Sequence, residues 1–142
     1  DGSADLAALV SKAKELLSSK QSSLEVEVDE DLFAKFVRHF GTAFQPFCAF
    51  LGGVVAQEVV KLAGKFTPIP GFLHVHAMEA LPDSPPVDCE ATGSRYDSLA
   101  AIYGHDFVKK LGDLKYFMVG CGALGCEFLK NFALNGVCCG PA

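Results

Sequence analysis

Three glycines in the pattern G-x-G-x-x-G constrain the fold of this chain more than any other feature. They are Gly120, Gly122 and Gly125. The segment 115–119 (KYFMV), apolar after its lysine, precedes them, and apolar residues at helical spacing follow them as far as Asn135-Gly136. This order predicts a buried strand over 115–119, a turn over 120–125 and a helix that begins at the turn.

Each glycine has an expected role in a strand-turn-helix unit of this kind. Gly120 permits the tight turn, Gly122 lets a nucleotide approach the main chain, and Gly125 lets helix and strand pack closely. The N-terminus of the helix offers N–H groups to phosphate or ribose oxygens. The loop lacks the G-K-[ST] ending of P-loop enzymes, and the acidic residue of dinucleotide sites would lie near or beyond Ala142. The pattern therefore predicts nucleotide binding, with a purely structural turn as the alternative.

The rest of the chain predicts mostly helices. Helices are expected over 5–17 with Ser3 as its cap, from Asp29-Glu30-Asp31 to Phe40, over 46–62 and around 107–111; a strand is expected over 72–78. The helix over 46–62 is apolar nearly all round, which is typical of a buried helix. Its Gly52-Gly53 pair suggests another backbone passing close by, or else a local bend.

Composition excludes several classes of protein. The net charge is −5 and no basic cluster exceeds Lys109-Lys110, which argues against a nucleic-acid surface. The longest apolar run, 47–56, is shorter than the roughly 20 residues of a membrane helix. The six cysteines form no C-x-x-C pair, so buried, reduced thiols are expected in place of zinc, and His74 and His76 are expected as surface residues. The sequence indicates a soluble protein without an export signal.

Two longer segments resemble ubiquitin-activating enzymes. The segment RYDSLAAIYGHDFVKKLGDLKYFMVGCGALGCEFLKNFALNGVCCG, residues 95–140, resembles the start of their active adenylation domain, and AFLGGVVAQEVVK followed by GKFTPI resembles the end of the inactive one. The resemblance implies three parts: residues 1–81 from the inactive half, a linker over 82–94, and residues 95–142 from the active half. The implied fold is α/β, an incomplete Rossmann-like adenylation fold (ThiF/MoeB-like), predominantly helical in this piece.

The same resemblance implies the chemistry. These enzymes use MgATP to adenylate the C-terminal carboxylate of ubiquitin and then form a thioester on an enzyme cysteine. Nucleotide contacts are implied for five residues of the loop, Gly120, Cys121, Gly122, Ala123 and Gly125, and Arg95 is a further candidate contact for phosphate. The catalytic cysteine and the ligands of magnesium are expected downstream, so no catalytic or metal-binding residue is assigned here. The implied partners are ubiquitin and ubiquitin-conjugating enzymes, in cytoplasm and nucleus.

The sequence also departs from the family and leaves alternatives open. Ser98-Leu99 stand where the family has Gly-Gln, Cys121 stands where Ala is typical, and His76 replaces an Asp. An NAD-dependent oxidoreductase fragment would share the glycine loop, and a non-catalytic ubiquitin-binding or scaffold module would also be compatible with the missing catalytic residues. As a piece of a ubiquitin-activating enzyme, the 142-residue chain is expected to be inactive alone.

Overall fold

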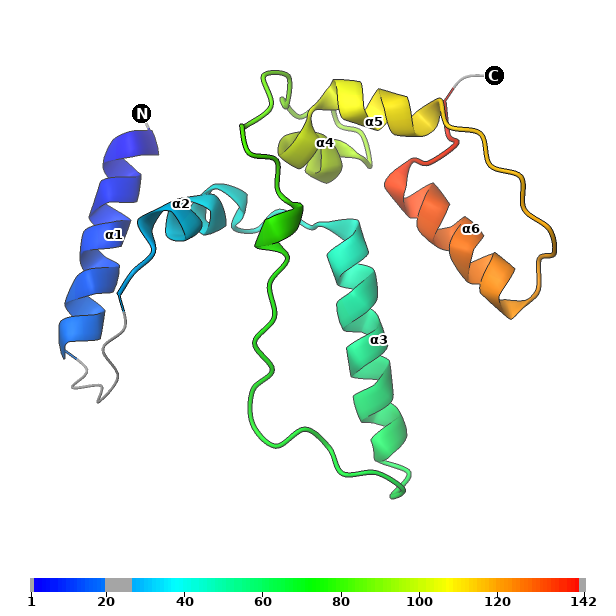
Figure 1. Cartoon of the computed structure of the whole chain (residues 1–142), viewed down its shortest axis with the longest axis horizontal. Helices are drawn as coiled ribbons and strands as arrows, with labels where there is room; N and C mark the ends of the chain where they lie inside the picture. The colour runs from blue at the N-terminus through cyan, green and yellow to red at the C-terminus, as the bar shows by residue number, and fades with distance from the viewer. Residues whose placement is uncertain (1, 20–26, 141–142) are drawn as a thin grey trace. The chain divides into compact units, whose positions relative to one another are not determined.

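A computed structural model describes residues 2–19 and 27–140 of the chain. The described residues form six α-helices and one short 3-10 turn (Figure 1). They fall into two compact units, residues 1–41 and 42–142. No helix in the described ranges is long and apolar enough to cross a bilayer.

The first unit contains two helices, α1 (Gly2–Ser19) and α2 (Glu30–His39). Both were expected. Asp29 was expected in the acidic start of this helix and lies one residue before it, where its carboxylate caps α2 by accepting a hydrogen bond from the Leu32 N–H at 2.9 Å. The predicted cap at Ser3 is wrong, because α1 already begins at Gly2 and Ser3 lies inside it. Because neither Ser3 nor Ala4 breaks a helix, α1 begins before the residue expected to cap it.

The second unit begins with α3 (Gln45–Lys61), which confirms the helix expected over 46–62. Its predicted burial is wrong, because none of its residues is buried and Val55 and Val59 are 61% and 59% exposed. A Cβ placed on Gly52 or Gly53 would meet no other atom within 4 Å. The close backbone approach is therefore also wrong in the described part of the chain, since no described element covers that face of α3.

Residues 62–96 contain no helix other than the 3-10 turn at Met78–Ala80. The strands predicted over 72–78 and 115–119 are both wrong, because no described residue belongs to a β-ladder. A β-forming sequence needs a neighbouring strand to receive its backbone hydrogen bonds, and the described residues supply none. The described part is therefore all-helical, which corrects the predicted α/β class while agreeing with its predominantly helical content.

Two short helices, α4 (Asp97–Tyr103) and α5 (His105–Gly112), meet at a sharp corner. The sequence predicted part of α5 and missed α4. Gly104 forms the corner with φ +86°, a left-handed conformation that favours glycine. The buried apolar core of the unit lies in α4 and consists of Leu99, Ala100 and Ile102.

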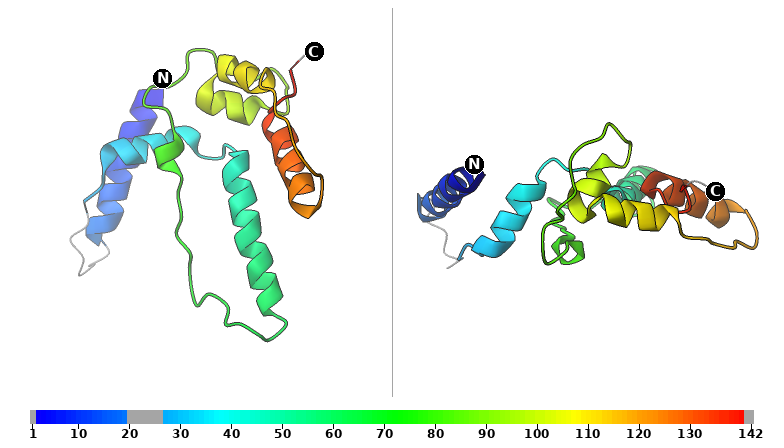
Figure 2. Two further views of the ribbon diagram at one scale, coloured as in Figure 1. Left: turned by 45° about the vertical axis from the view of Figure 1, so that its right-hand side comes forward. Right: turned by 90° about the horizontal axis from the view of Figure 1, so that it is seen from above.

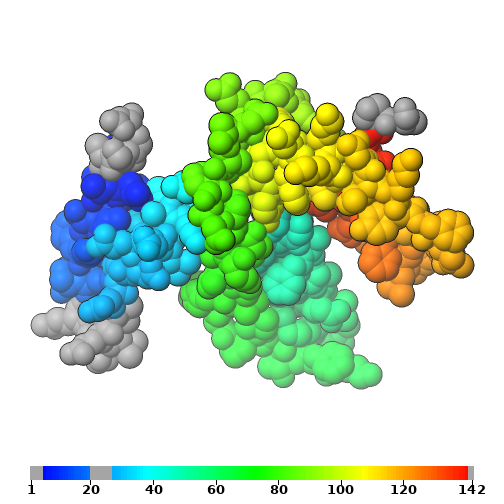
Figure 3. All heavy atoms as spheres, turned by 45° about the horizontal axis from the view of Figure 1, so that its top comes forward, coloured from blue at the N-terminus to red at the C-terminus, as the bar shows by residue number. Residues whose placement is uncertain are grey.

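The segment 80–90 lies against this corner (Figure 3). The Tyr103 hydroxyl donates to the Ala80 carbonyl at 2.6 Å, and the His105 N–H donates to the Asp88 carbonyl at 2.9 Å. A Cβ on Gly104 would lie 3.1 Å from Cβ of Pro86 and 3.2 Å from the Asp88 carbonyl oxygen. The segment that was expected to be a linker therefore packs closely on the corner, whereas the boundary at 82–94 stays a prediction.

The last helix, α6 (Ala123–Asn135), runs beside α3 (Figure 2) and confirms the helix expected after the glycine turn. Gly136 ends it in the left-handed conformation, with φ +75°. The Val137 N–H donates to the Phe132 carbonyl at 2.9 Å and the Gly136 N–H donates to the Ala133 carbonyl at 3.4 Å. This pair of bonds is a Schellman motif, which the Asn135-Gly136 ending predicts.

Three hydrogen bonds join the C-terminal end of α6 and the residues after it to the N-cap of α4 and the last turn of α5, and we call them the base clasp. The Tyr96 hydroxyl donates to the Ala133 carbonyl at 3.1 Å. The N–H groups of Cys138 and Gly140 donate to the carbonyls of Leu111 and Gly112, each at 3.0 Å. The base clasp fixes one end of α6, and the glycine turn lies at the other end.

Candidate nucleotide-binding loop

Gly120 and Gly125 have the structural roles that the motif predicts. Gly120 has φ +89°, which favours glycine over any residue with a side chain. A Cβ on Gly125 would lie 2.7 Å from the Gly120 carbonyl oxygen and 3.5 Å from Sδ of Met118. The first turn of α6 therefore packs directly on the preceding segment, which is extended chain in place of the predicted strand.

Gly122 differs from the other two glycines of the motif because no other part of the described chain packs against it. It is the N-cap residue of α6, with φ −74° and ψ −161°, a conformation that any residue adopts. A Cβ on it would meet no atom within 4 Å. Neither conformation nor internal packing requires glycine here, so a requirement for glycine would come from something that approaches the loop from outside.

The first turn of α6 supplies hydrogen-bond donors at the loop. The first helical bond runs from the Cys126 N–H to the Gly122 carbonyl at 2.9 Å. By helix geometry, the N–H groups of the three residues between them have no intrahelical acceptor. No side chain caps this end of the helix. The donors and the helix dipole together favour an oxygen-rich or anionic ligand at the loop.

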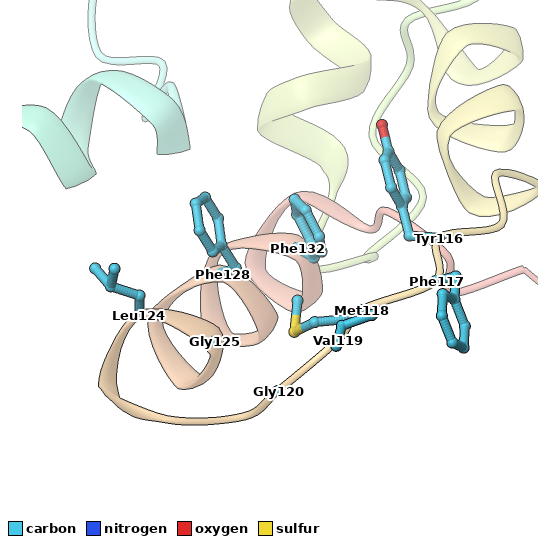
Figure 4. Close-up of a pocket in the computed structure, with 9 residues that line it drawn as sticks. All are labelled: Tyr116, Phe117, Met118, Val119, Gly120, Leu124, Gly125, Phe128 and Phe132. Carbon is cyan, nitrogen blue, oxygen red and sulfur yellow. The ribbon is translucent and has the colours of Figure 1, made fainter.

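An apolar pocket of about 400 Å³ lies between α6 and the segment that precedes it (Figure 4). Its lining residues are Tyr116, Phe117, Met118, Val119, Gly120, Leu124, Gly125, Phe128 and Phe132. The rings of Tyr116 and Phe132 stack with centroids 5.2 Å apart. Phe117 and Val119 are 93% and 87% exposed. The lining suits an apolar neighbour, so the pocket is not where phosphates would bind.

Arg95 lies at the other end of α6 from the glycine loop. Its guanidinium carbon is 5.7 Å from the ring centre of Tyr96, whose hydroxyl binds the Ala133 carbonyl. Ala133 lies ten positions after Ala123 in α6, which corresponds to about 15 Å of helix. The structure therefore does not bring Arg95 to the loop, and its predicted contact with phosphate stays a prediction.

Asp97 organises the turn that precedes α4, a role that the sequence reading did not assign. Its carboxylate accepts hydrogen bonds from the Thr92 N–H at 3.1 Å, the Thr92 hydroxyl at 2.9 Å and the Gly93 N–H at 2.8 Å. Burial raises the pKa of Asp97, but these hydrogen bonds outweigh it and hold the pKa below its ordinary value. The signal was available in the sequence, since an acidic residue follows the turn-forming Thr92-Gly93-Ser94.

The cysteines and histidines do not gather into a metal site in the described ranges, where no group of three or more metal-ligating side chains occurs. All six cysteines are free. The expectation that they are buried is wrong, because Cys89 is half-buried and the other five are exposed. They lie on surfaces that no described element covers. His74 and His76 are exposed, as predicted.

Comparison with known proteins finds relatives that are named as ubiquitin-activating or ubiquitin-like modifier-activating enzymes. No family model matches it. It is 42% identical over 147 aligned positions to human ubiquitin-like modifier-activating enzyme 1, which covers 99% of the chain and 14% of that relative. It is 45% identical over 128 positions to the mouse protein of the same name and to ubiquitin-activating enzyme E1 1 of Arabidopsis thaliana, covering 87% of the chain and 12% of each. The chain thus spans about one seventh or less of the length of these relatives. The chain is therefore homologous to a segment of the ubiquitin-activating enzymes E1.

Proposed function

We propose that residues 120–125 bind the adenosine end of ATP within a ubiquitin-activating enzyme of which this chain is a part. The observation that carries the proposal is the open space around Gly122. Neither the backbone conformation nor the packing of the loop requires a glycine at this position. In this proposal the main chain of Gly120, Cys121, Gly122, Ala123 and Gly125 contacts the nucleotide. The homology to ubiquitin-activating enzymes supports ATP as that nucleotide.

The proposed reaction of the whole enzyme is adenylation of the ubiquitin C-terminal carboxylate, followed by thioester formation on an enzyme cysteine. In this scheme residues 1–81 belong to the inactive adenylation half and residues 95–142 to the active half, with the linker 82–94 between them. Ubiquitin and ubiquitin-conjugating enzymes are the proposed partners, in cytoplasm and nucleus. The names of the relatives support this choice over an NAD-dependent oxidoreductase.

The contribution proposed for this chain is binding and not bond making. The described residues hold no cluster of side chains that fits Mg²⁺, so no step through magnesium is assigned to them. No cysteine of the chain is proposed as the thioester nucleophile, and Arg95 is retained only as a candidate phosphate contact for a nucleotide away from this loop. The loop residues bind and orient ATP through backbone N–H groups, which every residue other than proline carries.

A ligand titration of the 142-residue chain tests the proposal. ATP is expected to shift the backbone amide resonances of residues 120–125 in NMR spectra, whereas NAD⁺ at the same concentration leaves them unchanged. Gly122→Ala is expected to abolish the ATP shifts, because its Cβ occupies the space that the nucleotide needs. Shifts with NAD⁺ and none with ATP would favour the oxidoreductase. Shifts with ubiquitin alone would favour a binding module.

A further inference from the structure

The carbonyl groups of three consecutive loop residues all point toward one place, the Gly125-Cys126 pair in the first turn of α6. The Gly120 carbonyl oxygen lies 2.7 Å from the position of a Cβ on Gly125, closer than its carbon at 3.4 Å. The Cys121 carbonyl accepts a hydrogen bond from Sγ of Cys126 at 3.5 Å. The Gly122 carbonyl accepts from the Cys126 N–H at 2.9 Å.

This arrangement fixes where the N–H groups of the loop point. A trans peptide is planar and its N–H points opposite to its C=O, and the described residues contain no cis peptide. The N–H groups of Cys121, Gly122 and Ala123 share peptide planes with these three carbonyls. They therefore point away from α6, and none of them makes a hydrogen bond to another described residue. Three adjacent donors are thus presented on the outer side of the loop.

The middle one of the three peptides has the weakest support. The peptide after Gly120 is fixed by close packing on Gly125, and the peptide after Gly122 is fixed by the first bond of the helix. The peptide between Cys121 and Gly122 has a glycine on its C-terminal side, and a second glycine precedes Cys121, so the backbone around this peptide can rotate widely. Its one hydrogen bond in the described structure comes from the Cys126 thiol.

We propose that Cys126 is a positioning residue for the nucleotide loop: its thiol holds the Cys121–Gly122 peptide so that the Gly122 N–H faces the ligand. Cys126 does not touch the nucleotide itself. The inference rests on the proposed function for its effect on affinity, whereas its effect on loop order is independent of any ligand. A thiol is a weak donor, worth about a two- to fivefold change in affinity.

The test uses three variants of the full 142-residue chain. Cys126→Ala removes the donor, Cys126→Ser keeps a donor at the same position, and Cys48→Ala removes another exposed helical cysteine as the matched control. Backbone order parameters of residues 121–123 are measured by NMR relaxation, and ATP affinity is measured by titration. The midpoint of urea denaturation is measured for each variant to detect a general loss of structure.

We expect Cys126→Ala to lower the order parameters from about 0.85 toward 0.6 and to weaken ATP binding about two- to fivefold. Cys126→Ser should restore part of both, and Cys48→Ala should change neither. Unchanged order parameters in Cys126→Ala would overturn the inference, as would a serine variant no better than alanine. If ATP does not bind the unmodified chain, the proposed function fails, and the order parameters alone decide the role of Cys126.

Discussion

Replacing Gly125 by alanine should destabilise the packing of α6 on the segment before it. The new Cβ would lie 2.7 Å from the Gly120 carbonyl oxygen, whereas ordinary van der Waals contact begins at 3.4 Å. Relief requires a movement of about 0.7 Å between two pieces of backbone, and overpacking of this kind costs about 1 to 3 kcal/mol. Alanine recovers up to about 1 kcal/mol through its higher helix propensity. The expected net loss is about 0.5 to 2 kcal/mol in the free energy of unfolding.

Urea denaturation followed by circular dichroism at 222 nm measures this loss, and amide exchange in α6 locates it. Gly122→Ala is the matched control, because its Cβ enters open space and its backbone conformation suits alanine. The control should lose about 0.5 kcal/mol, because alanine is a poorer N-cap than glycine. The two variants should therefore differ in stability while both lose ATP binding. A Gly125→Ala variant as stable as the unmodified chain would refute the packing argument.

Three more predictions use other positions. Gly52→Ala and Gly53→Ala should each raise the free energy of unfolding by about 0.5 to 1 kcal/mol in urea titrations, because both glycines lie inside α3 with open space around them; destabilisation would show that another backbone covers them. Cys138→Gly should stabilise the chain by about 1 kcal/mol, because Cys138 has φ +58°; thermal denaturation showing a lower midpoint would contradict this. The pKa of Asp97 in the folded chain is below its ordinary value of 3.8, so its contribution to the free energy of unfolding is complete above that pH and is lost as the pH falls through the folded-state pKa. Asp97→Asn should therefore flatten the acidic part of a plot of the free energy of unfolding against pH. An unchanged plot would exclude the Asp97 carboxylate as the source of this pH dependence.

Local signals in the sequence predicted local structure well. The helix after the glycine loop, its end at Asn135-Gly136 and a helix that starts at the acidic residues 29–31 are all confirmed. Each depends on residues within a few positions of one another, and the physical cause is contained in the segment itself. The roles of Gly120 and Gly125 were predictable for the same reason, since the motif encodes a backbone conformation and a close contact.

Predictions that depended on partners elsewhere failed. The segments 72–78 and 115–119 have β-forming composition, but a strand exists only when another strand pairs with it. The burial of α3 and of the cysteines likewise required covering elements that the described residues do not supply. The helix α4 was missed because its seven residues are too few for a periodic pattern to stand out.

Because the base clasp and the glycine loop lie at opposite ends of α6, a small rotation of the helix at the clasp produces a larger displacement of the loop. The clasp holds α6 at Ala133 and just beyond its end, and the loop lies at the far end of the helix, whose thirteen residues extend about 20 Å. A tilt of about 10° at the clasp would displace the loop by roughly 3.5 Å, more than the length of a hydrogen bond. The rigidity of the clasp contacts made by Tyr96, Gly112 and Gly140 thus determines how accurately the distant loop is positioned to bind a ligand.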